Sequence, residues 1–180
     1  MARTIILVPM MYSREDLKKI LGLVPDDFEA TSLKFWGYVE EKLKPFVGRI
    51  HMIYSEKHDN KDPNSQLDSI LKKLINNHAE LQCIEDPLLA AEAEAWRELM
   101  KSSQNQAVSE LFEESMTERN EHAKGVIERT LGENQMGILF MDPTRKVSLP
   151  DDVKVIRMCP FDPIDYLNRH LVKLKTAKKE

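Results

Sequence analysis

Short apolar runs alternate along this chain with longer segments whose apolar residues recur every three or four positions. The first run, from Thr4 to Met10, is continuous and rich in β-branched residues, which is typical of a strand covered on both faces. Further strands are expected at 49–55, 80–85, 136–141 and 153–158, and helices at 28–43, 65–77 and 163–175. The polar composition of 56–64 predicts a loop. Strands separated by helices predict an α/β fold with a central, largely parallel sheet of about five strands flanked by helices.

One helical stretch is much longer than the others. The pattern is helical over about 87–131, with a break expected near 102–105. A chain of 180 residues fits one ordinary domain. We expect a single α/β domain over 1–176, followed by a flexible basic tail at 177–180.

Composition excludes several classes of protein. The net charge of −4 argues against a surface for nucleic acid, and no apolar run approaches the roughly 20 residues that span a bilayer. Cys83 and Cys159 lie far apart without metal-ligand spacing, which fits a reducing cytoplasm. No nucleotide-binding glycine motif is present, so we expect no cofactor, no nucleic acid and no membrane partner.

The first strand runs directly into a helix start. Ser13 and Asp16 have the spacing of a capping box, and Gly22 provides the stop. A helix that begins at the carboxyl end of a strand presents free backbone amides, so Tyr12, Ser13 and Arg14 are candidate residues for a ligand, including an anion.

Arg119 is the most informative residue of the long helical stretch. A helical wheel places it in the middle of the apolar face that Phe112, Ala123 and Val126 define. An arginine on such a face needs a carboxylate, a bound anion or a water-filled space, since it does not lose its charge. Two interpretations stay open, a structural ion pair and a guanidinium that faces a ligand.

Partners for Arg119 are expected at the carboxyl ends of the strands, where open α/β sheets bind ligands. Three strand ends carry polar residues, namely Tyr12-Ser13, Glu85-Asp86, and Asp142 with Thr144. Our specific prediction is a contact between Arg119 and Asp142. The alternative is that Asp142, which precedes Pro143, only starts a turn.

Three segments together resemble the TraB and ChaN-like superfamily, which includes the TIKI metalloproteases and erythromycin esterase relatives. They are "IILVPMMYS", the "ERN" of Glu118, Arg119 and Asn120 followed by "HAKGVIERTLGEN", and "MGILFMDPTRKV". The resemblance covers nearly the whole chain and implies a similar α/β layout. In the family, Gly-x-x-His motifs follow the first strand and a late strand, and a Glu-Arg-Asp or Glu-Arg-Asn lies on a long helix.

Both Gly-x-x-His motifs are missing from this chain. Pro9 and Tyr12 stand where the first is expected, and Met141 and Thr144 where the second is expected. A tyrosine phenol and a threonine hydroxyl are poor metal ligands at neutral pH, so we expect a degenerate site without metal. His58, Asp59 and Asp62 could in principle collect a metal, but without a recognised spacing.

Two functions from different classes follow. The favoured one is a noncatalytic or diverged domain that binds a small polar or anionic ligand, or a protein partner, around Tyr12, Ser13, Arg14, Glu118, Arg119 and Asp142. The alternative is a hydrolase with Asp142 or Glu118 as general base and Tyr12 as acid or oxyanion donor. A homodimer through an apolar face of Leu89, Trp96, Leu99 and Met100 is a third possibility.

Overall fold

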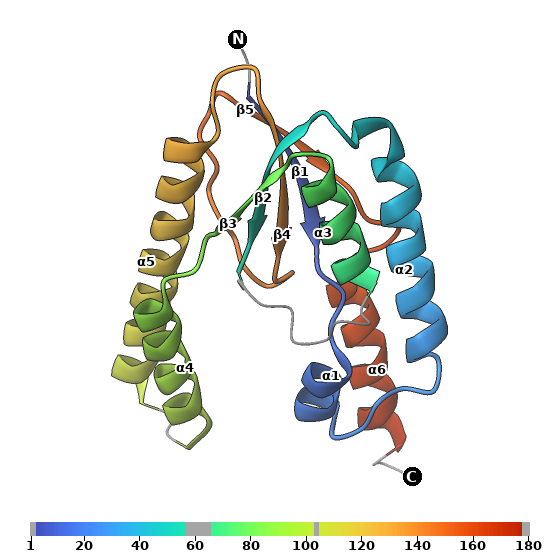
Figure 1. Ribbon diagram of the computed structural model, residues 1–180. Coiled ribbons are helices and arrows are strands. Elements are labelled where there is room, and N and C mark those ends of the chain that lie inside the picture. Colours follow the sequence, from blue (N-terminus) through green and yellow to red (C-terminus); the bar gives the residue numbers. More distant parts are fainter. Residues whose placement is uncertain (1–2, 57–65, 103–104, 178–180) are drawn as a thin grey trace.

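The fold is a parallel sheet between two layers of helices, as Figure 1 shows. The computed structural model describes residues 3–56, 66–102 and 105–177. Five strands pair in the order β3-β2-β4-β1-β5, and every pairing is parallel. The strands are β1 (Arg3–Pro9), β2 (Ile50–Ser55), β3 (Glu80–Cys83), β4 (Met136–Met141) and β5 (Val153–Arg157). The expected α/β fold is confirmed, and the sheet is parallel throughout.

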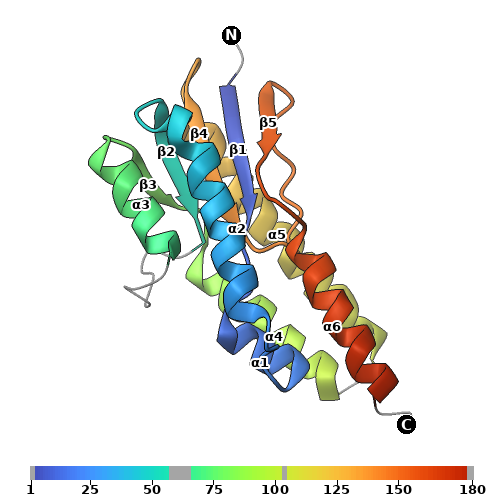
Figure 2. The same cartoon turned by 90° about the vertical axis from the view of Figure 1, so that its right-hand side faces the viewer.

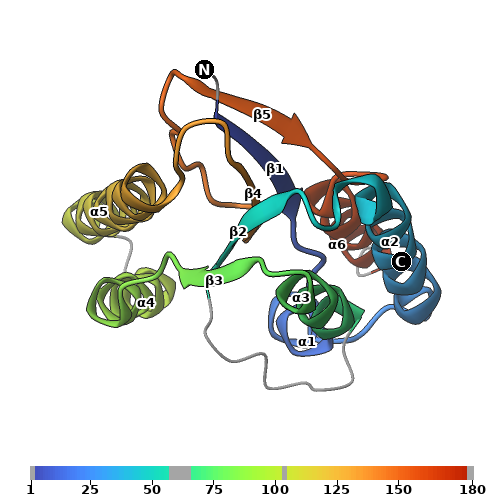
Figure 3. The ribbon, with the colours of Figure 1, turned by 45° about the horizontal axis from the view of Figure 1, so that its top comes forward.

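The helices fall into two groups on opposite faces of the sheet (Figure 3). One face carries α1 (Arg14–Leu21), α2 (Phe28–Leu43), α3 (Gln66–Asn76) and α6 (Pro163–Ala177), with a short 3₁₀ helix, η1 (Lys44–Phe46), after α2. The other face carries α4 (Pro87–Ser102) and α5 (Gln106–Thr130), which pack against each other. Figure 2 shows α2 lying across the sheet between α3 and α6. Because α4 ends at Ser102 and α5 begins at Gln106, the expected break in the long helical stretch is confirmed. The Asn105 side chain caps the start of α5.

The face under α2 holds an aromatic core. Phe35 packs edge-on against Trp36 and Phe161, with ring centroids 5.2 and 5.4 Å apart, and Trp36 reaches Phe140 of β4. Edge-to-face pairs of this kind add to the stabilisation from apolar burial. This core fixes α2 and α6 against the central strands and leaves the strand ends to other residues.

The face under α5 is covered partly without a helix. Ile5, Tyr54 and Leu139 of the sheet pack against Ile127 and its neighbours in α5. Parallel strands usually need a helical crossover, yet the connection from β4 to β5 contains none. Val147 and Leu149 of this connection pack against the core instead. These contacts hold the connection against the sheet, and the same connection carries Arg145 near the carboxyl ends of the strands.

The first helix starts as the sequence predicts. The Ser13 hydroxyl accepts a hydrogen bond from the Asp16 backbone N–H at 3.1 Å, and the Asp16 carboxylate accepts from the Ser13 N–H at 3.1 Å. Gly22 ends α1 in the left-handed conformation. The polar loop expected at 56–64 and the basic tail at 177–180 fall mostly outside the described residues.

The surface of the protein can be compared with two further expectations, namely the absence of a membrane-spanning helix and an apolar face on α4. Among the described residues, no helix combines the length and the apolar character needed to cross a bilayer. On α4, Leu99 and Met100 are exposed, whereas Leu89 and Trp96 are half-buried. Part of the expected apolar face is thus at the surface, and the homodimer stays a prediction.

Two glycines give opposite predictions for the stability of this fold. A Cβ on Gly137 of β4 would lie 2.9 Å from the Tyr54 ring, whereas a Cβ on Gly37 of α2 would meet nothing within 4 Å. We expect Gly137→Ala to lower the free energy of unfolding by about 1–3 kcal/mol through overpacking. Gly37→Ala should raise it by up to about 1 kcal/mol through helix propensity. Urea denaturation of both variants checks this pair, and equal effects would contradict the packing described.

Candidate functional site

Charged residues gather where β2, β3 and β4 end. Glu56 follows β2, Glu85 lies two residues beyond β3, and Asp142 follows β4. Because these strands are parallel and adjacent, their carboxyl ends meet at one edge of the sheet, the lower edge in Figure 1. Two arginines reach this edge, Arg119 from α5 and Arg145 from the β4–β5 connection. We call Glu56, Glu85, Arg119, Asn120 and Arg145 the strand-end network.

Arg119 forms a two-pronged ion pair with Glu85. Its Nε donates to Oε1 at 3.0 Å, and its Nη2 donates to Oε2. The two side chains are only 13% and 11% exposed. A fork-shaped pair of this kind is among the stronger polar contacts in proteins. The guanidinium expected on the apolar face of the helix is therefore paired with a carboxylate of the chain itself.

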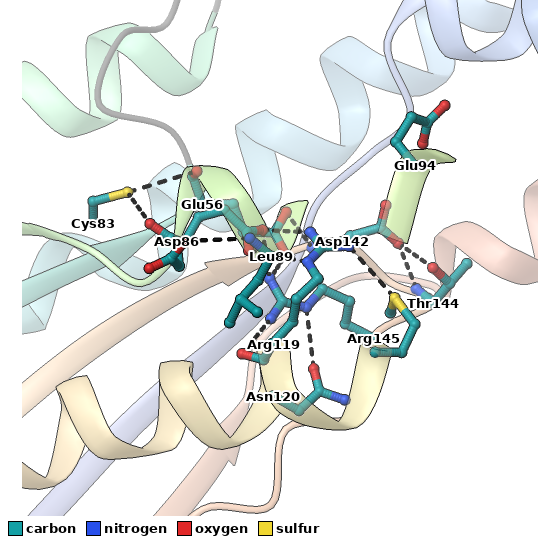
Figure 4. Close-up of polar contacts among 12 residues, drawn as sticks. Glu56, Cys83, Asp86, Leu89, Glu94, Arg119, Asn120, Asp142, Thr144 and Arg145 are labelled. Carbon is teal, nitrogen blue, oxygen red and sulfur yellow. Dashed lines mark hydrogen bonds and ion pairs between the residues drawn. The ribbon is translucent and has the colours of Figure 1, made fainter. Parts of the chain in front are cut away.

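Arg145 joins the network into one unit, as Figure 4 shows. Its Nη1 donates to Glu56 at 2.8 Å and to Glu85 at 3.0 Å. Its Nε and Nη2 donate to the Asn120 side chain and the Arg119 carbonyl, both at 3.2 Å. The Arg145 side chain is 2% exposed. Two guanidinium groups and two carboxylates thus neutralise one another in a nearly dry position.

The surroundings of Glu56 change its acidity. Burial raises the pKa of the Glu56 carboxyl above its usual range, and the Arg145 guanidinium only partly opposes this rise. Asp142 and Glu85 add a smaller push in the same upward direction. The ion pair with Arg145 is therefore a close balance between desolvation and attraction.

Asp142 is not the partner of Arg119, and that prediction was wrong. One Asp142 carboxylate oxygen accepts from the Thr144 backbone N–H at 2.7 Å and from the Thr144 hydroxyl at 2.5 Å. This is an Asx-type turn, the alternative that the Asp-Pro pair also suggested. Asp142 acts on Arg119 only through its charge, because the Arg119 guanidinium is paired with Glu85, which follows the edge strand β3.

The other candidate residues lie apart from the strand-end network. Ser13 is committed to its capping box, and its hydroxyl also bonds to Asp16 at 2.6 Å. Arg14 is exposed and pairs with Glu29 of α2 at 2.5 Å. Glu118 is exposed on α5. Of these candidates and Arg119, Asp142 and Tyr12, the structure therefore brings Arg119 and Asp142 to the ends of β2, β3 and β4.

Tyr12 has an unusual hydroxyl. The residue is 8% exposed, and its buried hydroxyl has no hydrogen-bond partner within the part of the chain that the structure describes. Burial first, and then the charges of Asp142, Asp162 and Asp16, raise the pKa of Tyr12 to about 12. The phenol is therefore protonated at neutral pH and can donate a hydrogen bond. Buried polar groups without a partner are rare, and each calls for an explanation.

Sequence reasoning missed Arg145, Glu56 and Asn120. Arg145 follows β4 by only four residues and Glu56 follows β2 directly, so the strand-end rule could have selected both. Glu56 was grouped with a polar loop, and Arg145 lies in a turn without periodicity. Asn120 is the third residue of the "ERN" element and accepts a bond from Arg145, which gives that element a structural role here.

The described residues hold no cluster of three or more histidine, cysteine or acidic side chains suited to a metal ion. The weak metal candidate of His58, Asp59 and Asp62 lies outside the described residues. Comparison of the chain with protein-family models, with curated proteins and with solved structures gives no match in any of the three. The site must therefore be interpreted from its own geometry.

Removing Arg145 is expected to destabilise the fold strongly. Arg145→Met would leave Glu56 and part of Glu85 buried without their cation, and losing one partner of a buried pair costs about 3–5 kcal/mol. Arg14→Met, which breaks an exposed pair, should change the free energy of unfolding by less than about 1 kcal/mol. Chemical denaturation measures both. Similar losses in the two variants would contradict a structural role for the network.

Glu56 gives a prediction about pH. The folded protein binds the Glu56 proton more tightly than the unfolded chain, so this group contributes less stability as pH rises from the ordinary value of 4.5 toward the raised pKa. The free energy of unfolding of wild type minus that of Glu56→Gln should therefore fall through this window.

Glu41 provides the control, because Lys44 lowers the pKa of Glu41. The same difference for Glu41→Gln should rise with pH below 4.5. Titrations of stability by urea denaturation at several pH values test both signs. A difference for Glu56→Gln that does not decline would show that its carboxyl is not harder to ionise in the folded state.

Proposed function

We propose that this chain is a noncatalytic or catalytically diverged α/β domain, TraB/ChaN-like in layout, that binds a small polar ligand at the carboxyl ends of its strands. The observation that carries the proposal is the buried, unpartnered hydroxyl of Tyr12. Tyr12 occupies the position where the resemblance expects a metal-binding histidine. A cytoplasmic location belongs to the same proposal, in keeping with the two free cysteines, Cys83 and Cys159.

The charges around the site favour a neutral or donor-rich ligand over an anion. Arg119 is paired with Glu85, and Arg145 is paired with both Glu56 and Glu85, so the charge of each guanidinium is already balanced without a phosphate or carboxylate ligand. Tyr12 in turn feels the negative charges of Asp142 and Asp162. A ligand that accepts a hydrogen bond from the Tyr12 hydroxyl and offers a donor toward Asp142 suits this environment. Amino acids and polyols have such paired groups.

The alternative hydrolase has less support. Glu118 is exposed and Asp142 is held in its own turn, so neither is placed as a free general base. Glu56 has a raised pKa, as many catalytic carboxyls do, but its carboxylate is bound to Arg145. A binding role for the strand ends therefore accounts for more of the geometry.

Access to Tyr12 requires local movement, because the hydroxyl is enclosed. The covering side chains must shift when a ligand enters, as they commonly do at binding sites. Tyr12 packs in the core that also holds Phe28 of α2 and Tyr166 of α6, so the movement would take place in this core. We expect the strand-end network, which lies toward α5, to stay closed while the Tyr12 hydroxyl serves as the recognition point.

Tyr12→Phe tests the proposal in two ways. Since the hydroxyl has no partner to lose, the free energy of unfolding should change by less than about 1 kcal/mol. Tyr54→Phe is the matched control, because the buried Tyr54 hydroxyl bonds Thr130 at 3.0 Å and its loss should cost about 0.5–1.5 kcal/mol.

A thermal-shift screen of wild type with free amino acids, polyols and inorganic phosphate supplies the second readout. We expect one or more of the amino acids or polyols to raise the Tm of wild type and of Tyr54→Phe but not of Tyr12→Phe, and phosphate to have no effect. If no amino acid or polyol raises the Tm of the wild type, or if the Tm of Tyr12→Phe rises by the same amount, the proposal is wrong.

A further inference from the structure

An open pocket lies at the opposite ends of the strands from the strand-end network. Its volume is about 470 Å³, within the range of small-molecule sites. It is lined by residues from the start of β2, the α3–β3 turn, β3, the end of α5 and the α5–β4 turn. The pocket therefore sits where three connections of the fold meet, namely those that precede β2, β3 and β4, and these connections lie at the upper edge in Figure 1.

The wall contributed by β3 presents two adjacent polar side chains. Glu80 and Gln82 are two residues apart on one strand, so both side chains lie on the same face, and both line the pocket. β3 is an edge strand and pairs only with β2. No hydrogen bond within the described residues occupies the Gln82 amide, which offers one acceptor and two donors.

The opposite wall adds donors that are fixed by their own contacts. His51 Nδ1 accepts the Met136 backbone N–H at 3.4 Å, which assigns the remaining imidazole proton to Nε2. His51 lies in an irregularity of the β2–β4 pairing, a feature that re-aims side chains in many sites. The Gln135 side-chain oxygen accepts from the Gly132 N–H at 2.8 Å, so its amide nitrogen is left as a donor.

The charge of the pocket restricts the ligand further. Glu80 is the one charged side chain among the lining residues, and no lysine or arginine lines the pocket. Arg49, between two lining residues, is exposed and does not line it. A phosphate group would find no cation here. The mixture of one carboxylate, one free amide and fixed N–H donors suits an uncharged planar heterocycle.

We infer that this pocket binds a nucleobase or nucleoside that carries an exocyclic amino group and no phosphate. A glutamine side chain forms hydrogen bonds with two positions of adenine, and a carboxylate accepts a hydrogen bond from the cytosine amino group. Gln82 and Glu80 supply these two groups on neighbouring positions of one strand face. The site is independent of Tyr12, which lies at the other end of the strands.

Matched ligands make the test direct. Adenosine and cytidine have the amino group, whereas inosine and uridine replace it with a carbonyl, and adenosine monophosphate adds a phosphate. Titration into ¹⁵N-labelled protein should shift the backbone signals of His51, His78 and Gln82 with adenosine or cytidine. Inosine and uridine should bind at least about fivefold more weakly, the loss expected for one missing base contact.

Variants separate this pocket from other surfaces. Gln82→Leu should weaken adenosine or cytidine binding by about fivefold or more, whereas Tyr12→Phe and Glu113→Gln, a change on the exposed face of α5, should leave it unchanged. An unchanged circular dichroism spectrum of Gln82→Leu excludes unfolding as the cause. Equal binding of amino and carbonyl nucleosides, tighter binding of the monophosphate, or no saturable shift with any of them would overturn the inference.

Discussion

The buried guanidinium of Arg145 is the contact on which the carboxyl edge of this sheet depends. It is almost fully removed from solvent and bonds to Glu56 after β2, to Glu85 after β3 and to two groups of α5. A charge in such a position is tolerated only when its donors are matched by acceptors. The connection that carries Arg145 has no helix of its own, so these contacts, with Val147 and Leu149, determine its course.

The strand-end network also decides between the two interpretations of Arg119 in favour of the structural ion pair. A guanidinium on the inner face of a helix can indicate a ligand, but here Glu85 satisfies it. The position at strand ends that hosts ligands in many α/β proteins is therefore occupied partly by the chain's own charges. Tyr12 differs, since its hydroxyl is buried in the core of the other face and has no hydrogen-bond partner among the described residues. The proposed ligand site consequently rests on Tyr12 rather than on the arginines.

The sequence predicted the elements better than their contacts. Apolar runs located β1, β2 and β4 because these strands are buried and short, and β3 and β5 were located although they are largely half-buried or exposed. The capping box located the start of α1. The strand order was not predictable, because general rules do not say that β4 lies between β2 and β1. That order decides which carboxylate Arg119 meets, which explains why Asp142 was chosen in place of Glu85.

Residues outside the periodic segments escaped prediction for a physical reason. Arg145 and Glu56 lie just beyond strands, where no repeat of apolar positions indicates the direction of a side chain. Their burial follows from the β4–β5 connection folding back over the sheet, a long-range event. Ser13 and Arg14 were selected from a local pattern and Glu118 from the family resemblance, and these residues satisfy local contacts or face solvent.

A double-mutant cycle between Glu85 and Arg119 tests the central claim most directly, namely that the strand-end network is a closed structural unit. The free energy of unfolding is measured for wild type, Glu85→Gln, Arg119→Met and the double variant. The account predicts a coupling energy of about 1–3 kcal/mol, because each single change leaves a buried charge without its partner. Effects that add to within about 0.5 kcal/mol would contradict it and would free Arg119 for a ligand.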